Sequence, residues 1–149
     1  MTIKELVPRD ELSIADADAL PGDPALAEVA QDLFDTLNAI PHCLGLTAPQ
    51  IGSPLRLLAF DLYPRHENRP LGPLVILNPQ IVASDGESVR NEICFSLGGT
   101  RKHVTRPERV FLKGLSITGA EVRTEAAGLE ARVLQHLIDH LRGVTFDRL

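Results

Sequence analysis

The chain has 149 residues, of which 44% are hydrophobic and 4% aromatic, the size and composition of one soluble globular domain. Lys and Arg number 15 against 20 Asp and Glu, for a formal net charge of −5 and no basic run typical of nucleic-acid binding. No apolar stretch is long enough to span a membrane, and the N-terminus lacks the shape of a signal peptide. We therefore expect one cytoplasmic domain over residues 1–149, with no nucleic-acid or membrane partner; the sequence leaves the oligomeric state open.

The first predicted element is a helix that begins at Asp23-Pro24, an N-cap followed by a first-turn proline. Apolar residues then recur at helical spacing up to Pro41. Strands are predicted over Leu55 to Asp61 and over Leu74 to Leu77, the second of them ended by Asn78-Pro79.

The second half of the chain is predicted to add more strands before a final helix. A strand is predicted from Glu87 to Cys94, after Gly86. Arg109 to Lys113 and Ala120 to Thr124 are predicted to pair around a turn near Gly119. The chain is therefore predicted to mix helices and strands.

The last predicted helix runs from about Gly128 to Arg142, with Gly143 as its C-terminal stop. Its polar residues are predicted to form one solvent-facing stripe, made of Arg132, Gln135, Asp139 and Arg142. A flank of the buried side is predicted to hold Leu129, Val133, His136 and His140. Two histidines that face inward are better explained by a metal ion than by solvation.

The strongest chemical signal is the segment Gln135-His136-Leu137-Ile138-Asp139-His140. Two histidines four residues apart present their imidazoles on one helix face and can hold one metal ion. In the H-E-x-x-H pattern, the residue after the first histidine is a Glu that handles the proton of a metal-bound water. Leu137 occupies that position here. The alternative is a pair of satisfied core histidines, because this spacing also occurs by chance.

A metal site needs a third ligand, and Cys94 is the conspicuous candidate, at the end of a predicted strand. As a thiolate it would complete a Cys-His-His site with one open position, the arrangement of a catalytic metal. The alternative is a small buried hydrophobe. Glu92 precedes Cys94 by two residues and would either orient a ligand histidine or an arginine, or be a plain charge at the strand end.

Three segments in this order are similar to known motifs: Gly45-Leu46-Thr47-Ala48-Pro49-Gln50, Glu92-Ile93-Cys94-Phe95-Ser96 and Gln135-His136-Leu137-Ile138-Asp139-His140. They resemble the peptide deformylase family, whose motifs are approximately G-φ-G-φ-A-A-x-Q, E-G-C-L-S and H-E-x-x-H, with φ an apolar residue. The similarity continues in flanking segments and covers nearly the whole chain from about Leu26. It implies an α+β fold with antiparallel strands around a central C-terminal helix that binds the metal.

The resemblance also implies a role for each matching residue. Cys94, His136 and His140 match the ligands of one divalent metal ion, commonly ferrous iron in that family, with zinc or nickel as substitutes. Gln50 matches the glutamine that polarises the formyl oxygen together with a backbone N–H, here that of Phe95.

The same resemblance implies an N-formylated peptide, or the N-terminus of a nascent chain, as the substrate. Gly45 and Leu46 match the substrate-binding loop, where the main chain approaches the ligand closely. Arg106 would help to bind the peptide; the alternative is a solvated surface charge.

Leu137 is the departure from the family that matters most, because a leucine cannot accept a proton. General acid–base catalysis contributes about 10²–10⁴-fold, so we expect weak deformylase activity. The alternatives are an inactive metal-containing protein that binds N-terminal peptides, and an amide hydrolase of another substrate.

Smaller departures concern the loops around the predicted site. Cys43 stands where the first motif usually begins with glycine, and would be an extra thiol near the site or a small packed residue. Ile93 and Phe95 replace the usual Gly and Leu of the second motif and change the shape of the pocket. The remaining histidines, predicted to be surface groups, are His42, His66 and His103.

Overall fold

The computed structural model describes residues 2–8, 15, 18–61, 74–94 and 100–144. Its helices and strands, in chain order, are α1 (Pro24–Ala39), β1 (Gly45–Thr47), the 3-10 helix η2 (Ala48–Ile51), β2 (Leu57–Phe60), β3 (Leu74–Asp85), β4 (Ser88–Cys94), β5 (Thr100–Arg106), β6 (Arg109–Leu115), β7 (Glu121–Ala127) and α2 (Gly128–Leu141).

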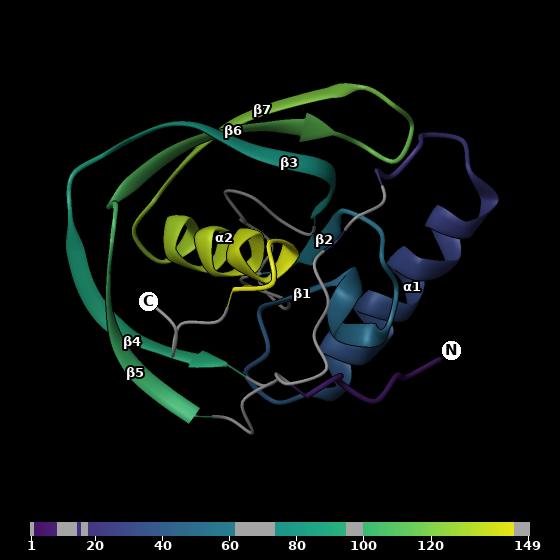
Figure 1. Cartoon of the computed structure of the whole chain (residues 1–149), viewed down its shortest axis with the longest axis horizontal. Coiled ribbons are helices and arrows are strands. Elements are labelled where there is room, and N and C mark those ends of the chain that lie inside the picture. Colours follow the sequence, from purple (N-terminus) through teal and green to yellow (C-terminus); the bar gives the residue numbers. More distant parts are fainter. Residues whose placement is uncertain (1, 9–14, 16–17, 62–73, 95–99, 145–149) are drawn as a thin grey trace.

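Within the described residues, the strands form a five-stranded antiparallel sheet and a separate two-stranded ribbon. The sheet has the order β1-β2-β3-β6-β7, and β4 pairs with β5 in the ribbon. Figure 1 shows α2 in the middle of the molecule, with the sheet on one side, the β4–β5 ribbon on another, and α1 outside. The predicted α+β fold, with antiparallel strands around a C-terminal helix, is therefore confirmed.

Strand β2 lies between two hydrophobic cores, and its four residues are all buried. Leu58 and Phe60 point into the core that contains the apolar side of α2. Leu57 and Ala59 alternate with them and point into the second core, beneath α1. This strand thus fixes the central helix against the sheet.

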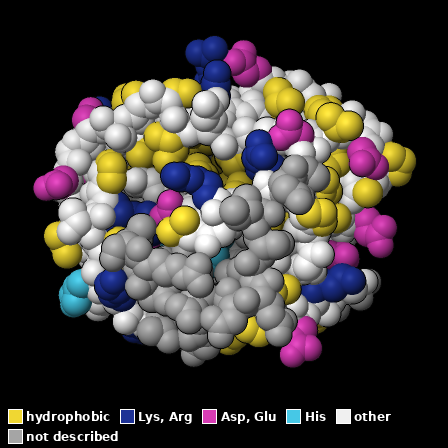
Figure 2. Space-filling model, in the orientation of Figure 1, with side chains coloured by type: hydrophobic (Ala, Val, Ile, Leu, Met, Phe, Trp, Pro, Cys, Tyr) yellow, Lys and Arg dark blue, Asp and Glu magenta, His cyan; other side chains and the backbone are white. Residues whose placement is uncertain are grey.

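On the face shown in Figure 2, acidic and basic side chains are interspersed around the rim.

Local signals for the ends of elements are confirmed where the chain carries specific capping residues. The side chain of Asp23 accepts a hydrogen bond from the backbone N–H of Ala25, as an N-cap does. Gly143 follows the end of α2 with a φ of 73°, a conformation that favours glycine. Strands β6 and β7 pair around Gly119, whose φ is 90°.

Strand β3 continues where a strand end was predicted. Asn78-Pro79 does not terminate it; the strand runs on to Asp85 with a register shift between Leu77 and Gln80. Asn78 adopts a φ of 51°, which asparagine tolerates better than most residues, and Pro79 lies in the irregular segment, where no ladder N–H is needed. The proline therefore marks a bulge rather than an end.

The predicted solvent-facing stripe on the last helix is wrong for its first two residues. Arg132 is only 3% exposed and Gln135 only 6%, whereas Arg142 is exposed. The β4–β5 ribbon covers this side of α2, because Arg132 bonds to Ser88 and Gln135 bonds to the carbonyl of Pro107. On the predicted buried flank, Leu129 is instead 44% exposed.

Candidate metal centre and its surroundings

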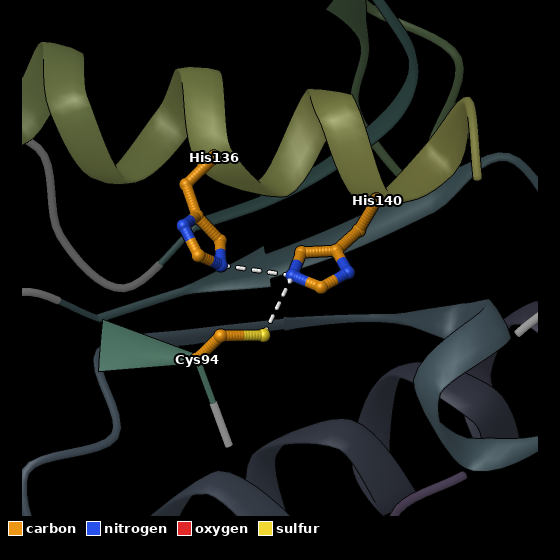
Figure 3. Close-up of side chains that lie close together, drawn as sticks. All are labelled: Cys94, His136 and His140. Carbon is orange, nitrogen blue, oxygen red and sulfur yellow. Dashed lines mark hydrogen bonds between the residues drawn. The ribbon is translucent and has the colours of Figure 1, made fainter. Parts of the chain in front are cut away.

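Cys94, His136 and His140 come together in space, and we refer to them as the candidate metal centre. Their three ligand atoms all lie within 4.8 Å of one another. The Nε2 atoms of the two histidines are 2.8 Å apart, and Sγ of Cys94 lies 3.4 Å from Nε2 of His140. Figure 3 shows both rings turned toward the other ring and the sulfur. One thiol and two imidazole nitrogens around one point fit a single divalent ion.

His140 is buried and held in the neutral form that can bind a metal. Its side chain is 1% exposed, and burial, together with the neighbouring His136 and Arg106, lowers its pKa to about 3. A neutral imidazole offers a lone pair to a metal, which a protonated ring does not. Within the described residues, Nδ1 of His140 has no hydrogen-bond partner.

His136 is oriented by Glu92, which lies at the centre of a buried charge cluster. Oε1 of Glu92 is 2.9 Å from Nδ1 of His136, so the ring presents Nε2 to the candidate metal centre. Burial by itself would raise the pKa of Glu92, but the hydrogen bonds from His136 and Arg106 lower it to about 2. Glu92 therefore orients a histidine and an arginine, and the alternative of a plain strand-end charge is wrong.

Arg106 lies behind Glu92 and is not a solvated surface charge, since it is 6% exposed. It donates to Glu92 through Nε at 2.5 Å and Nη2 at 2.9 Å, and to Asp139 through Nη1 at 2.7 Å. Burial alone would lower its pKa, but these two carboxylates raise it. The guanidinium of Arg106 is thus bonded to two carboxylates of the protein itself. Its contact with a peptide stays a prediction.

A cavity of about 120 Å³ lies beside the candidate metal centre. Its walls include Gly45, Gln50, Ile93, His136 and Leu137. Gln50 is 3% exposed, and its Oε1 accepts hydrogen bonds from the backbone N–H and the hydroxyl of Thr47, at 3.0 and 3.1 Å. These two hydrogen bonds fix the orientation of the amide, with Oε1 directed at Thr47.

Leu137 makes one wall of this cavity apolar. A Cβ placed on Gly45 would lie 2.6 Å from Cδ1 of Leu137 and 3.0 Å from the carbonyl oxygen of Ala59. A larger residue at position 45 would therefore require the side chain of Leu137 to shift. Leu137 is itself 3% exposed and packs in the core beneath the sheet, so the wall it forms offers no proton acceptor.

The other predicted loop residues divide between the cavity and the core. The side chain of Leu46 is 1% exposed and packs beneath α1, so a substrate contact at this position would come from the main chain. The thiol of Cys43 is buried, points to the carbonyl of Gly45 at 3.5 Å, and has its pKa raised to about 11 by burial. It is a packed residue. Phe95 lies outside the described residues.

The predicted surface histidines have two outcomes. His42 and His103 are exposed, as predicted, although His42 also borders the cavity. His66 lies outside the described residues.

Arg132 is the residue near the site whose role the sequence did not reveal. Its Nη1 donates to Oε2 of Glu92 at 2.6 Å. The spacing of residues on the helix could have indicated this role. Arg132 precedes His136 by four residues, as His136 precedes His140, so all three lie on one face.

An antiparallel sheet wrapped around a helix that carries two histidines of a candidate metal centre, with a facing cysteine, is the arrangement of a class of metal-dependent hydrolases. The family model described as polypeptide deformylase matches residues 10–149, so the chain belongs to the peptide deformylase family. Its members use a single divalent metal ion. The predicted resemblance is thereby confirmed.

Individual relatives agree with this membership. The peptide deformylase of Thermodesulfovibrio yellowstonii is 48% identical over 120 residues, which cover 80% of this chain and 70% of that protein. The crystal structure of a peptide deformylase from Legionella pneumophila matches with a TM-score of 0.89 at 35% identity, over 99% of this chain and 86% of that one. The crystal structure of the peptide deformylase from Ehrlichia chaffeensis in complex with actinonin matches with a TM-score of 0.89 at 33% identity. The match covers 100% of this chain and 90% of that one.

No helix in the part of the chain that the structure describes is long and apolar enough to cross a membrane.

Proposed function

We propose that this chain removes the formyl group from formylmethionyl peptides, slowly, because the proton acceptor of its family is replaced by Leu137. The reaction adds one water across the formamide bond and releases formate and the free N-terminal amine. The observation that carries the proposal is the convergence of Cys94, His136 and His140 beside a cavity walled by Gln50 and Gly45.

The proposed ligands are Cys94, His136 and His140, and the proposed native metal is ferrous iron, with zinc or nickel as substitutes. When bound, the metal acts as a Lewis acid that polarises the formyl carbonyl and makes water a better nucleophile. The amide of Gln50 donates to the formyl oxygen as negative charge develops there. The backbone N–H of Phe95 is the proposed second donor. One donor of this kind is worth about 10²–10³-fold in rate.

The proton pathway is the incomplete part of the proposed site. A proton must leave the attacking water, and another must reach the departing amine. The methyl groups of Leu137 can do neither. Among the described residues that line the cavity, Glu92 is the one carboxylate, and it is committed to His136 and two arginines. Solvent or a buffer base must carry the proton, so we expect turnover lower by about 10²–10⁴-fold.

A second candidate function is binding without turnover. The observation in its favour is the close packing of Leu137 over Gly45, which gives the cavity a dry wall suited to an apolar N-terminal residue. In this case the chain would hold formylated or other N-terminal peptides, including nascent chains. The third candidate, an amide hydrolase of another substrate, uses the same residues on a different acyl group.

The test is turnover of formyl-Met-Ala-Ser by protein loaded anaerobically with ferrous iron, with binding of the same peptide measured in parallel. Slow release of formate, abolished in Cys94→Ala and retained in the exposed-histidine variant His103→Ala, is the expected result. Binding without formate release would support the binding protein instead. Release of a different acyl group, with none of formate, would support the third candidate.

A further inference from the structure

Arg132 is a buried cation that connects the central helix to the ribbon. Its Nη1 donates to Oε2 of Glu92 at 2.6 Å and to the carbonyl of Val104 at 2.8 Å. Its Nη2 donates to the carbonyl of Ser88 at 2.8 Å and to its hydroxyl at 3.0 Å. One guanidinium thus joins α2 to both strands of the ribbon, at 3% exposure.

The spacing of residues on α2 matches the spacing on β4. Arg132, His136 and His140 recur every four residues along one face of the helix. At a rise of about 1.5 Å per residue, each lies about 6 Å from the next. Glu92 and Cys94 share one face of the strand, about 6.7 Å apart. Arg132 and His136 therefore meet Glu92, and His140 meets Cys94 one step further along. The hydrogen bond from Arg132 to Glu92 therefore bears on the distance between α2 and β4 at the neighbouring pair, His140 and Cys94.

The two ligand histidines differ in what orients them. His136 is held through Nδ1 by Glu92, whereas Nδ1 of His140 has no partner among the residues described. The geometry of the candidate metal centre therefore depends on the position of Glu92. Arg106 also holds Glu92, and it reaches α2 through Asp139, whose side chain is 19% exposed. Arg132 makes the deeper connection, from the turn before His136.

We propose that Arg132 is a positioning residue for the metal ion: it holds Glu92 and β4 against α2, so that His136 and Cys94 face each other at ligating distance. Its role is to position other groups, since both of its Nη atoms donate to oxygens of the protein. The proposal rests on the ligand set of the proposed function and is independent of deformylation itself.

The test compares Arg132→Met and Arg132→Lys with Gln135→Leu, a buried control on the same helix. Gln135 donates to the carbonyls of Pro107 and Ala131, and among the described residues its side chain makes no hydrogen bond to Glu92. Zinc affinity is measured by competition with a chromophoric chelator, and ligand geometry by the absorption spectrum of the cobalt-substituted protein. Arg132→Met is expected to weaken zinc binding about 10–100-fold and to alter the cobalt spectrum. Arg132→Lys keeps the charge but not the forked contacts, so its zinc affinity should lie between those of the native chain and of Arg132→Met. Gln135→Leu should bind zinc as the native chain does.

Native zinc affinity and an unchanged cobalt spectrum in Arg132→Met, with thermal destabilisation equal to that of Gln135→Leu, would show a purely structural role and overturn the proposal. If Arg132→Met does not fold, native affinity in Arg132→Lys overturns it equally. A native chain that binds no zinc would refute both the ligand set and this inference. A native chain that binds zinc but releases no formate would refute only the deformylase proposal.

Discussion

Two walls of one cavity differ sharply in their chemistry. On one wall, the carboxylate of Glu92 receives hydrogen bonds from two buried arginines and orients His136 toward the candidate metal centre. On the other, the apolar side chain of Leu137 packs closely over Gly45. The contrast teaches that the groups that support the candidate metal centre and the position of the motif's proton acceptor lie on separate parts of this fold. The buried charge cluster around Glu92 is complete, while position 137 carries a leucine in place of a proton acceptor.

The largest expected effect is the recovery of turnover on the apolar wall. Leu137→Glu places a carboxylate where the motif has its proton acceptor, and we expect kcat/KM for a formyl-Met peptide to rise about 10²–10⁴-fold. Leu137→Gln is the matched control, because it has similar size and polarity but accepts no proton at neutral pH. An equal gain in both variants would mean that polarity, not proton transfer, limits the native chain.

The polar wall should respond to the loss of one charge. Glu92→Gln leaves the guanidinium groups of Arg106 and Arg132 buried without their carboxylate, and we expect a loss of about 3–5 kcal/mol in the free energy of unfolding. Urea denaturation of the metal-free protein measures it. The exposed residue Glu121 lies outside this cluster, so Glu121→Gln should change stability little. Similar losses in both variants would contradict the central role given to Glu92.

The packing of the two residues on the apolar wall predicts a smaller, coupled effect. Gly45→Ala forces a methyl group against Cδ1 of Leu137 and should cost about 1–3 kcal/mol of unfolding free energy. In the Leu137→Ala background the same change should cost less, because only the contact with the carbonyl of Ala59 remains. Additive losses in the double variant would show that the two residues do not restrict each other.

The remaining effect is a dependence of stability on pH in the metal-free protein. Burial and the neighbouring His136 lower the pKa of His140 from its ordinary 6.5 to about 3. Between these values the unfolded chain binds a proton that the folded chain does not, so the free energy of unfolding should fall as pH drops from 6.5 toward 3. Glu92, whose pKa is lowered from 4.5 to about 2, adds to the fall below 4.5.

Urea denaturation across this range measures the slope, and His103→Ala, which alters an exposed histidine, is the control. The slope should be reduced in His140→Leu and unchanged in His103→Ala. Stability that is constant or rises on acidification would contradict the buried, neutral state of His140.

Much of the candidate site could be predicted because its signals are local or periodic. The spacing of His136 and His140 implies one helix face, and the cap at Asp23 and the stop at Gly143 depend only on nearby residues. The proposed third ligand, Cys94, was predicted as a conspicuous thiol at a strand end and then matched the second motif, and it lies beside both histidines.

The burial of Arg132 could not be predicted, because it depends on a carboxylate 40 residues away in the sequence. A charged residue on a helix is normally solvated, and periodicity does not show that a ribbon covers that face. Strand β5 was not predicted for the same reason: its sequence Arg101-Lys102-His103 looks like a loop until it pairs with β4. Asn78-Pro79 looks like a strand end until the bulge is seen.

The most direct test of the central claim is to measure zinc affinity and formate release on the same samples of the native chain and of Leu137→Glu. If the two walls are separate parts, zinc affinity should be equal in the two proteins, while formate release should be higher in Leu137→Glu by about 10²–10⁴-fold. A gain in formate release that tracks a gain in zinc affinity would contradict the account, because the native defect would then lie in holding the metal and not in moving the proton.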